Sequence, residues 1–74
     1  MNPNTPNRII KATQHACEKH PFFAKSPEHA VSLATEELGE MAKAINDGNW
    51  QQAAAETLDT IAVLVRTLEM LEDL

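Results

Sequence analysis

Cysteine, tyrosine, clustered basic residues and long apolar runs are scarce or missing in this chain of 74 residues. Cys17 is the only cysteine, which excludes a disulfide framework. Its position in a helical pattern predicts a small buried apolar side chain. The longest apolar run, Ile61–Val65, is far too short to span a membrane, so we expect no membrane partner. A chain this short buries a limited core, and its stability therefore needs a metal ion or oligomerisation.

The charge balance excludes a further class of partner. The formal net charge is −5, and the six lysines and arginines are scattered singly along the chain. Because there is no basic patch or aromatic platform, we expect no nucleic-acid binding. An acidic chain can still bind a phosphorylated small molecule when metal ions reverse the local field. Met1–Asn7 contains no basic segment followed by an apolar run, so we expect no signal peptide and a cytoplasmic location.

The sequence predicts an all-α fold in one domain, residues 1–74, because it has no sustained alternation of apolar and polar residues. A first helix over about 6–20 is expected to begin at Thr5-Pro6, a hydroxyl N-cap followed by proline. Pro21 should end it. Two loop phenylalanines, Phe22 and Phe23, are expected to plug a small core, with stacking on a base as the alternative. The apolar residues that recur at helical spacing in the first helix are Ile9, Ile10, Thr13, Ala16 and Cys17.

Two longer helices, over about 27–46 and 50–72, are predicted to form an antiparallel hairpin. Ser26 and Asn49 are suitable N-caps, and Gly48 is a natural C-terminal stop. The short connection makes the two helices antiparallel neighbours. The last helix carries apolar residues on two opposite sides and should be buried on both. One chain is too small to cover both sides, which predicts a homo-oligomer, a dimer or a tetramer, with a four-helix-type bundle.

Two acidic pairs lie at mirrored distances from Gly48. Glu37 and Glu40 precede this glycine, and Glu56 and Asp59 follow it. In an antiparallel hairpin, Glu37 faces the level of Asp59, and Glu40 faces the level of Glu56. Each pair is spaced i, i+3, so it projects from one side of its helix. Four carboxylates converging from two helices suit a hard cation such as Mg²⁺ or Mn²⁺.

The alternative interpretation of these acids is a solvated helical surface, where charged residues usually lie. Against it, Glu36 and Glu40 are like charges at i, i+4, with no lysine one turn earlier to offset their repulsion. Glu37 also lies within the apolar arc of its helix, and Glu56 and Asp59 share their side with apolar residues. Half-buried carboxylates without partners are costly, which favours a cation among them.

The stretch Glu36-Glu37-Leu38-Gly39-Glu40, fifteen intervening residues and then Glu56-Thr57-Leu58-Asp59 resembles the signature of the MazG-like nucleoside triphosphate pyrophosphohydrolases. That superfamily is all-α, and the resemblance extends from Ser26 to about Leu71. It implies a Mg²⁺ site, in which Mn²⁺ can substitute, and Glu36 in or near it. The ligands that it implies are Glu37, Glu40, Glu56 and Asp59.

The resemblance also implies a reaction, the hydrolysis of a nucleoside triphosphate between its α- and β-phosphates to a monophosphate and pyrophosphate. Such an activity suits the removal of unwanted nucleotides. Glu36 or Glu40 would orient the attacking water or take its proton. Because many relatives carry further helices that complete the nucleotide pocket, a catalytically weak MazG-like binding module is the alternative. A second alternative, a phosphoribosyl-ATP pyrophosphohydrolase, ranks lower because that family has lysines before its glutamates and Ala30–Thr35 has none.

Three basic residues are candidates for binding substrate phosphates. Arg66 follows Asp59 by seven residues, which is two helical turns along the same side. Its alternative role is a salt bridge to Glu69 or to an acid of another subunit. Lys43 follows Glu40 by three residues, a spacing that an ion pair explains better. Lys25 precedes the start of the second helix. The histidines show no metal-ligand spacing among themselves, and we expect surface or loop positions for all three: His15, His20 and His29.

Overall fold

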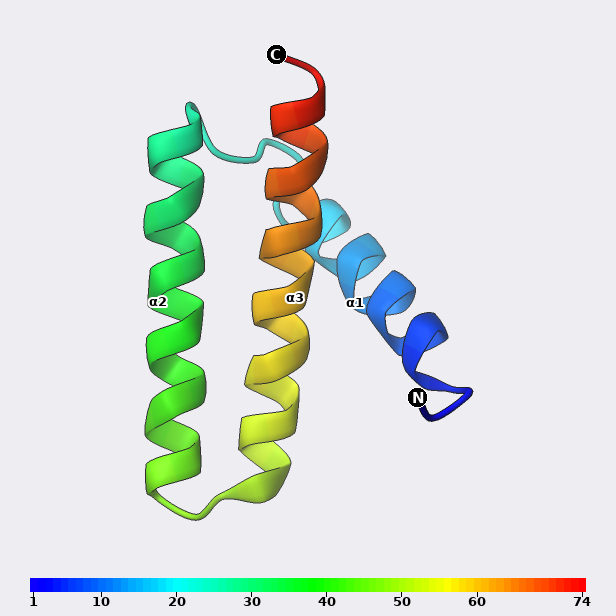
Figure 1. The fold of residues 1–74 in the computed structure, drawn as a ribbon, viewed down its shortest axis with the longest axis vertical. Coiled ribbons are helices and arrows are strands. Elements are labelled where there is room, and N and C mark those ends of the chain that lie inside the picture. Colours follow the sequence, from blue (N-terminus) through cyan, green and yellow to red (C-terminus); the bar gives the residue numbers. More distant parts are fainter.

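The computed structural model describes all 74 residues and contains three helices and no strand. Helix α1 covers Thr5–Lys19, α2 covers Pro27–Asn46 and α3 covers Trp50–Glu72 (Figure 1). The predicted all-α fold is confirmed, and the bounds of α2 and α3 agree with those predicted. None of the three helices combines the length and the apolar character that crossing a membrane requires.

The start of α1 differs from the prediction. Asn4, not Thr5, is the N-cap residue, and no side-chain hydrogen bond caps this helix. The side chain of Asn2 instead accepts a hydrogen bond of 2.9 Å from the main-chain N–H of Asn4. Thr5 can be the first residue of the helix because Pro6 still lies in the first turn. Proline is tolerated there, since the N–H groups of that turn have no helical partner. The end is as expected, since His20, before Pro21, leaves the helical region at φ −132° and ψ 79°.

The caps of α2 and α3 are the predicted ones. The hydroxyl of Ser26 accepts a hydrogen bond of 3.1 Å from the N–H of His29. The side-chain oxygen of Asn49 accepts one of 3.1 Å from the N–H of Gln52. Each cap satisfies one of the main-chain donors that the first turn of a helix leaves free. The two longest helices are therefore delimited by local chemistry that is readable in the sequence.

A Schellman motif ends α2 and turns the chain into α3. Gly48 has φ +71°, a left-handed conformation that costs glycine nothing. Its N–H donates to the carbonyl oxygen of Ile45 at 3.0 Å, and the N–H of Asn49 donates to that of Ala44 at 3.0 Å. These two bonds satisfy carbonyl groups at the end of α2 within a three-residue connection. They make α2 and α3 a tight antiparallel hairpin.

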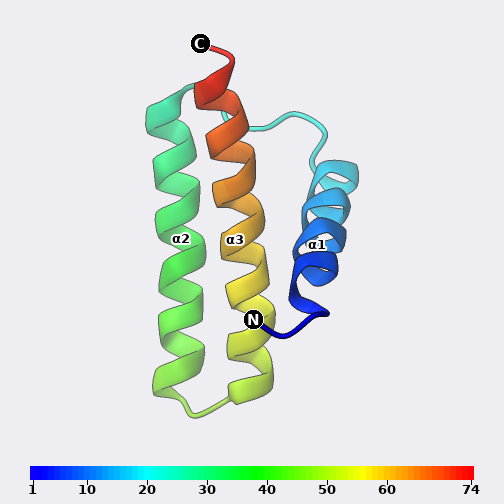
Figure 2. The ribbon, with the colours of Figure 1, turned by 45° about the vertical axis from the view of Figure 1, so that its right-hand side comes forward.

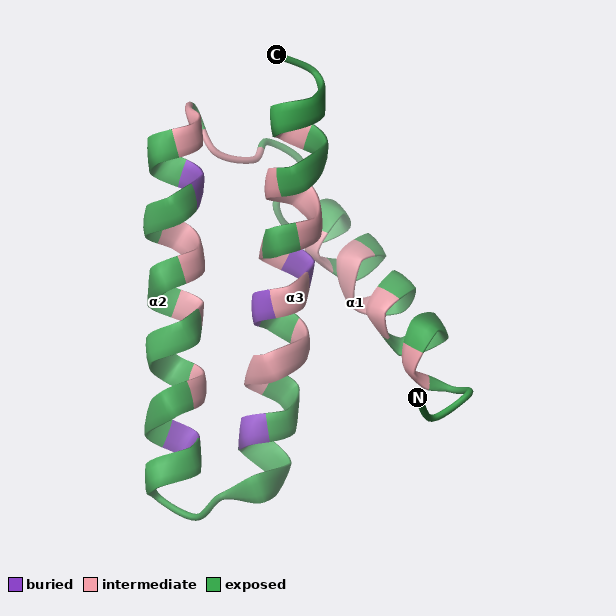
Figure 3. Cartoon of the chain, in the orientation of Figure 1, coloured by how far each residue is buried: buried purple, intermediate pink, exposed green.

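Helix α3 is the centre of the molecule. It packs against α2 along the hairpin and against α1 on another side, whereas α1 and α2 do not pack against each other (Figure 2). The buried apolar residues are all alanines. The buried positions of α2 lie on the inner side of the hairpin, whereas those of α3 lie both on this inner side and on the side toward α1 (Figure 3). These alanines are Ala30, Ala44, Ala53 and Ala62. Small side chains at the contact let two helices approach closely.

The contact of α1 with the rest of the chain is shallow. No residue of α1 is buried, although its last turns lie beside α3. Two of its predicted apolar positions, Ile10 and Cys17, are exposed. The prediction that Cys17 is buried is therefore wrong. The reason is that a single helix, α3, covers α1, so that only a narrow stripe of α1 can lie against protein.

The chain leaves an unusually large part of its apolar surface open. Only 5 of the 74 residues are buried, and no large side chain is fully buried. The radius of gyration is 12.7 Å, compared with roughly 11.3 Å for a compact domain of this length. Of the two apolar sides predicted to be buried on α3, the one that includes Ala62 and Val63 is buried or partly buried. The other, which bears Leu64, Leu68 and Leu71, is exposed in the single chain.

Candidate metal site and adjoining pocket

Three of the predicted ligands meet on the hairpin. One carboxylate oxygen each from Glu37, Glu56 and Asp59 lies within 4.8 Å of the others. Two oxygens on opposite sides of a bound Ca²⁺ or Mg²⁺ are roughly 4 to 5 Å apart, given metal–oxygen distances of about 2.0 to 2.6 Å. Only small side-chain movements would therefore place all three oxygens around one ion. The mirrored spacing about Gly48 produces this convergence because α2 and α3 are antiparallel.

The fourth predicted ligand, Glu40, lies beside the cluster. Its carboxyl group is exposed, and a hydrogen bond with the Glu56 carboxyl group raises its pKa above the ordinary value. The negative charges of Glu56, Glu36 and Asp59 contribute to the same increase. Glu36 is exposed and does not belong to the group of oxygens that could hold an ion. The structure thus brings Glu40 to the edge of the site and leaves Glu36 farther from it.

The cluster carries negative charge that the chain does not neutralise. Burial raises the pKa of Glu37, and the charges of Glu40, Asp59, Glu56 and Glu36 raise it further. The only salt bridge in the structure, Lys43–Asp47, involves none of these carboxylates. A cation bound among them would relieve both the repulsion and the cost of burial. The donor set, all carboxylate oxygens, fits a hard divalent ion.

Glu56 is held in place by a residue that the sequence did not single out. The side-chain amide of Gln52 donates a hydrogen bond of 2.6 Å to Oε1 of Glu56, one turn along α3. Hydrogen bonds of this kind orient metal ligands and are part of a functional site. The i, i+4 spacing of glutamine and glutamate was visible in the sequence. It was uninformative there, because such pairs are common on exposed helical surfaces.

A pocket of about 520 Å³ opens beside the carboxylates, between α1, the α1–α2 loop and the hairpin. Glu37 and Asp59 line it on the hairpin side, together with Leu33. Positive or titratable side chains contribute much of the remaining lining, and they are His15, Lys19, His20, His29 and Arg66. The pocket thus has carboxylates in one part and basic groups in another. This is a suitable environment for a ligand that carries both metal-bound and free phosphate oxygens.

The pocket brings the three histidines together, which the sequence did not predict. All three are exposed, as expected for surface positions, yet all three line the same pocket. His15 belongs to α1, His20 to the loop and His29 to the first turn of α2. Their convergence depends on how α1 lies against α3, and no local pattern specifies that orientation. Phe22, which we expected to plug a core, is 92% exposed at the rim of this pocket, whereas Phe23 is partly buried.

Arg66 lines the pocket and also connects α1 to α3. Its guanidinium group donates to the carbonyl oxygens of His20 at 2.9 Å and Ala16 at 3.4 Å. The same group lies 4.7 Å from the centre of the Phe23 ring. The salt bridge to Glu69 suggested by the sequence is absent. Arg66 instead binds carbonyl oxygens at the end of α1, where a positive charge interacts favourably with the helix dipole.

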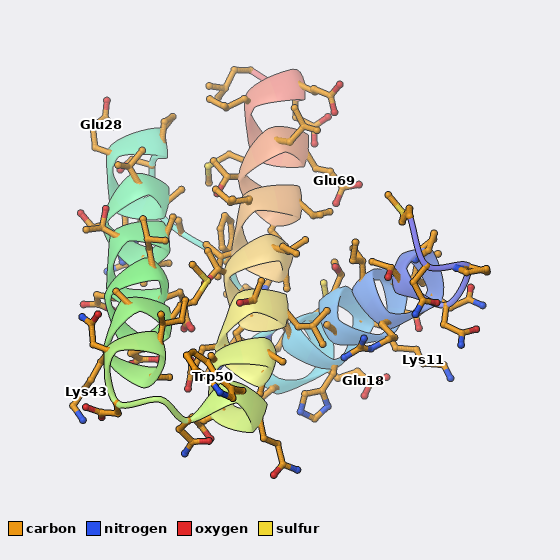
Figure 4. All side chains as sticks on the ribbon, turned by 60° about the horizontal axis from the view of Figure 1, so that its bottom comes forward. Lys11, Glu18, Glu28, Lys43, Trp50 and Glu69 are labelled. Carbon is orange, nitrogen blue, oxygen red and sulfur yellow. The ribbon has the colours of Figure 1, made fainter.

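The two candidate lysines lie apart from the main pocket. Lys43 pairs with Asp47 at 3.2 Å, not with Glu40 as its spacing suggested, and projects from α2 away from α3 (Figure 4). It lines a second, shallower hollow of about 340 Å³ together with Glu40 and Glu56. Lys25 lines neither hollow, and its N–H donates to His29 Nδ1 at 3.1 Å. The carboxylates therefore lie between two hollows, only one of which is rich in basic groups.

The chain matches no protein-family model, and no curated protein or solved structure is significantly similar to it. The resemblance of its acidic motifs to the MazG-like signature therefore stands on those motifs alone. What the chain does is to be inferred from the geometry of the hairpin, the cluster of carboxylates and the pocket beside them.

Proposed function

We propose that this protein is a Mg²⁺-dependent nucleoside triphosphate pyrophosphohydrolase that releases a nucleoside monophosphate and pyrophosphate. The observation that carries the proposal is the convergence of Glu37, Glu56 and Asp59, without a positive partner, at the edge of a pocket lined by basic groups. Mn²⁺ is expected to substitute for Mg²⁺, because both prefer oxygen ligands. The acidic motifs that resemble the MazG-like signature lie at this same place on the hairpin.

In this proposal the two parts of the site have different tasks. Glu37, Glu56 and Asp59, with Glu40 beside them, would hold the divalent ions, which neutralise phosphate charge and lower the pKa of water. The basic residues of the pocket, Lys19 and the histidines among them, would bind the phosphate oxygens that the ions leave free. Phe22 at the rim offers an exposed ring on which a base could stack.

Glu40 is the better candidate for positioning the attacking water. It lies next to Glu56, as the raised pKa of its own carboxyl group indicates, and it is exposed. Glu36 was an equal candidate in the sequence, but it does not belong to the convergent group. Glu40→Gln should therefore reduce turnover more than Glu36→Gln.

The phosphate-binding roles that the sequence suggested differ in their structural support. Arg66 lines the pocket, although its guanidinium group already binds main-chain oxygens. Lys43 lines the smaller hollow beside Glu40 and would have to leave Asp47 to reach a substrate. Lys25 lines neither hollow. We therefore propose Arg66 first among the three, as a phosphate contact at the far side of the pocket from the carboxylates.

The proposal includes a homo-oligomer that forms a four-helix-type bundle. Its support is the small buried core, which contains 5 residues in a chain of 74. Small domains without disulfides usually gain stability from a metal or from association. The exposed apolar residues of α2 and α3 offer a surface through which the chain would associate.

A nucleotide panel tests the proposed reaction. The protein is incubated with Mg²⁺ and standard and modified nucleoside triphosphates, and released pyrophosphate is measured. At least one nucleotide should be cleaved, and Asp59→Asn should lower the rate by about 100-fold or more, because a ligand charge is lost. The matched control is Glu69→Gln, an exposed acid on the same helix outside the cluster, which should leave the rate unchanged.

Two outcomes would decide against this reaction in different ways. Binding of Mn²⁺ in calorimetry without pyrophosphate release from any nucleotide favours a MazG-like binding module. No binding of Mn²⁺ or Mg²⁺ at millimolar concentration contradicts the metal site itself, and the acids would then be an ordinary solvated surface.

A further inference from the structure

Two reciprocal hydrogen bonds, which we call the histidine cap, join the first turn of α2 to the α1–α2 loop. The hydroxyl of Ser26 accepts from the N–H of His29 at 3.1 Å, and Nδ1 of His29 accepts from the N–H of Lys25 at 3.1 Å. His29 is the third residue of α2, the position from which the glutamate or glutamine of a capping box reaches back to a main-chain N–H. Here an imidazole ring supplies that acceptor, and it reaches the residue before the N-cap.

The bond to Lys25 requires one protonation state of the His29 ring. A main-chain N–H can only donate, so Nδ1 must be the ring nitrogen that has no proton. The neutral ring then has its proton on Nε2, whereas a charged ring has a proton on both nitrogens and accepts no hydrogen bond. The histidine cap is therefore closed only while His29 is neutral.

Residues 21–25 of the α1–α2 loop depend on this cap. The bond from Lys25 to His29 is the only hydrogen bond that their main chain makes. At the other end of the loop, Arg66 binds the carbonyl oxygen of His20. Phe22 and Phe23 lie between these two attachments, and both line the pocket. Opening of the cap would therefore free one end of a segment that forms part of the pocket wall.

We propose that His29 is a pH-sensitive switch, which holds the α1–α2 loop against α2 when it is neutral and releases the loop when it is protonated. Histidine is the side chain whose charge ordinarily changes between about pH 5 and 8. A glutamate or glutamine at the same position would remain an acceptor over this range, because neither side chain changes its charge there. The histidine at the third position of α2 thus makes the cap, and with it the wall of the pocket, dependent on pH.

The charged groups around His29 act in both directions. A positive ring is unfavourable at the N-terminus of α2, where the end of the helix dipole is positive. The basic or titratable groups near it are Lys25 of the cap and, lining the same pocket, His15 and Lys19 of α1, His20 of the loop and Arg66 of α3. The acidic groups, which favour a charged ring, are Glu28 beside it on α2, Glu37 farther along α2 and Asp59 of α3. Their balance affects the pH at which the ring gains its proton, but the bond to Lys25 is lost with that proton in every case.

An NMR titration of the whole chain in EDTA, from about pH 8 to about pH 5, tests the switch. At the upper end of the range, a long-range correlation of ring protons and nitrogens should show His29 with its proton on Nε2. As the pH falls, the amide proton of Lys25 should move upfield with the same midpoint as the His29 ring, because its hydrogen bond is lost. The heteronuclear NOE of Phe23 and Ala24 should decrease over the same range, since the released end of the loop becomes mobile.

Substitutions of the histidines separate this switch from a general effect of pH. His29→Gln keeps a side-chain oxygen as acceptor but cannot gain a charge, so the Lys25 amide and the loop should not respond to pH. His29→Ala removes the acceptor, and its loop should be mobile at both ends of the range. His15→Gln is the matched control, because His15 lines the same pocket from α1 and makes no hydrogen bond to the loop. It should retain the titration of the Lys25 amide that the wild type shows.

Several results would overturn the proposal. They are a neutral His29 ring with its proton on Nδ1, a Lys25 amide that does not follow the His29 ring, and a loop that is equally rigid at both ends of the range. The same response to pH in His29→Gln as in the wild type would overturn it as well. None of these measurements involves a metal ion or a nucleotide, so the switch and the proposed reaction can fail independently.

Discussion

The guanidinium group of Arg66 donates a hydrogen bond of 2.9 Å to the carbonyl oxygen of His20, although the two residues are 46 positions apart in the sequence. This side chain joins α3 to the end of α1. It donates a second hydrogen bond to the carbonyl oxygen of Ala16, and it lies over the ring of Phe23. Because no residue of α1 is fully buried, these polar contacts are part of what attaches α1 to α3. The pocket exists only while α1 stays in place.

Removing the hydrogen bonds of Arg66 to Ala16 and His20 should loosen the attachment of α1 to α3. Arg66→Met keeps an apolar chain of similar length but loses both hydrogen bonds, and we expect about 1 to 2 kcal/mol lower free energy of unfolding in urea. Hydrogen exchange should accelerate in α1 and much less in the hairpin. Arg8→Met serves as the control, since Arg8 is exposed and makes no side-chain hydrogen bond or salt bridge. Equal protection of α1 in both variants would show that other contacts hold this helix.

Divalent cations should stabilise the protein against heat. A ligand that binds only the folded state contributes about 1.4 kcal/mol at ten times its Kd. For a domain of this size, that corresponds to an increase in Tm of roughly 6 to 11 °C. Asp59→Asn should remove the increase in scans with and without Mg²⁺, and Glu69→Gln should retain it. An identical Tm with Mg²⁺ and with EDTA would exclude a structural contribution of the site.

The ion-free protein should lose stability as the pH rises. The folded-state pKa values of Glu37 and Glu40 are raised above 4.5, so both groups bind protons more tightly in the folded than in the unfolded chain. Their contribution is therefore fully present below about pH 4.5 and is lost as the pH rises through the raised values. Thermal melts in EDTA across this range measure the effect. Glu37→Gln should flatten the profile, whereas a profile unchanged by this substitution would contradict the assignment.

The hydrogen bond from Gln52 should contribute to ion affinity. Gln52→Ala removes the donor that orients Glu56 and leaves the carboxylates in place. Partners that orient metal ligands affect affinity by about 10- to 100-fold, and we expect a loss near the lower end on this exposed surface. Calorimetric titration with Mn²⁺ measures it. Gln51→Ala is the control, because Gln51 is exposed and makes no side-chain hydrogen bond, and it should bind Mn²⁺ as the wild type does.

The two glycines should respond oppositely to alanine. Gly39 lies inside α2, and a Cβ atom added there would meet no other atom within 4 Å, so Gly39→Ala should raise the free energy of unfolding by about 1 kcal/mol. Gly48 also has open space around it, but its φ of +71° is strained for alanine, and Gly48→Ala should lower that free energy by about 1 kcal/mol. Urea denaturation distinguishes them. Destabilisation by Gly39→Ala would indicate that another subunit contacts this position.

The hairpin could be predicted from the sequence because its determinants are local. Ser26, Gly48 and Asn49 fix the ends of α2 and α3, and the short turn then fixes which residues of the two helices lie at one level. The convergence of Glu37 with Asp59 follows from that register. Nothing beyond helical geometry and one turn was needed for this part of the site.

The position of α1 could not be predicted, since it depends on contacts between distant residues. The two hydrogen bonds of Arg66 to main-chain oxygens have no signature in the sequence, because any residue can offer a carbonyl group. The pocket, and with it the convergence of three histidines, is a consequence of those contacts. The pairing of Lys43 with Asp47 instead of Glu40 had a related cause, since two acids lay within helical reach and Glu40 is turned toward Glu56.

The alanines inside the hairpin have a consequence for the acids that lie between the same helices. Ala30 and Ala44 of α2 and Ala53 of α3 are almost inaccessible to solvent, and the separation of two packed helices depends on the side chains at their contact. A leucine at one of these positions would move the two helix axes apart and carry the carboxylates of α2 away from those of α3. The reach of each carboxylate is fixed by its covalent length, so the size of the ion that the proposed site would accept depends on residues that are not among its proposed ligands.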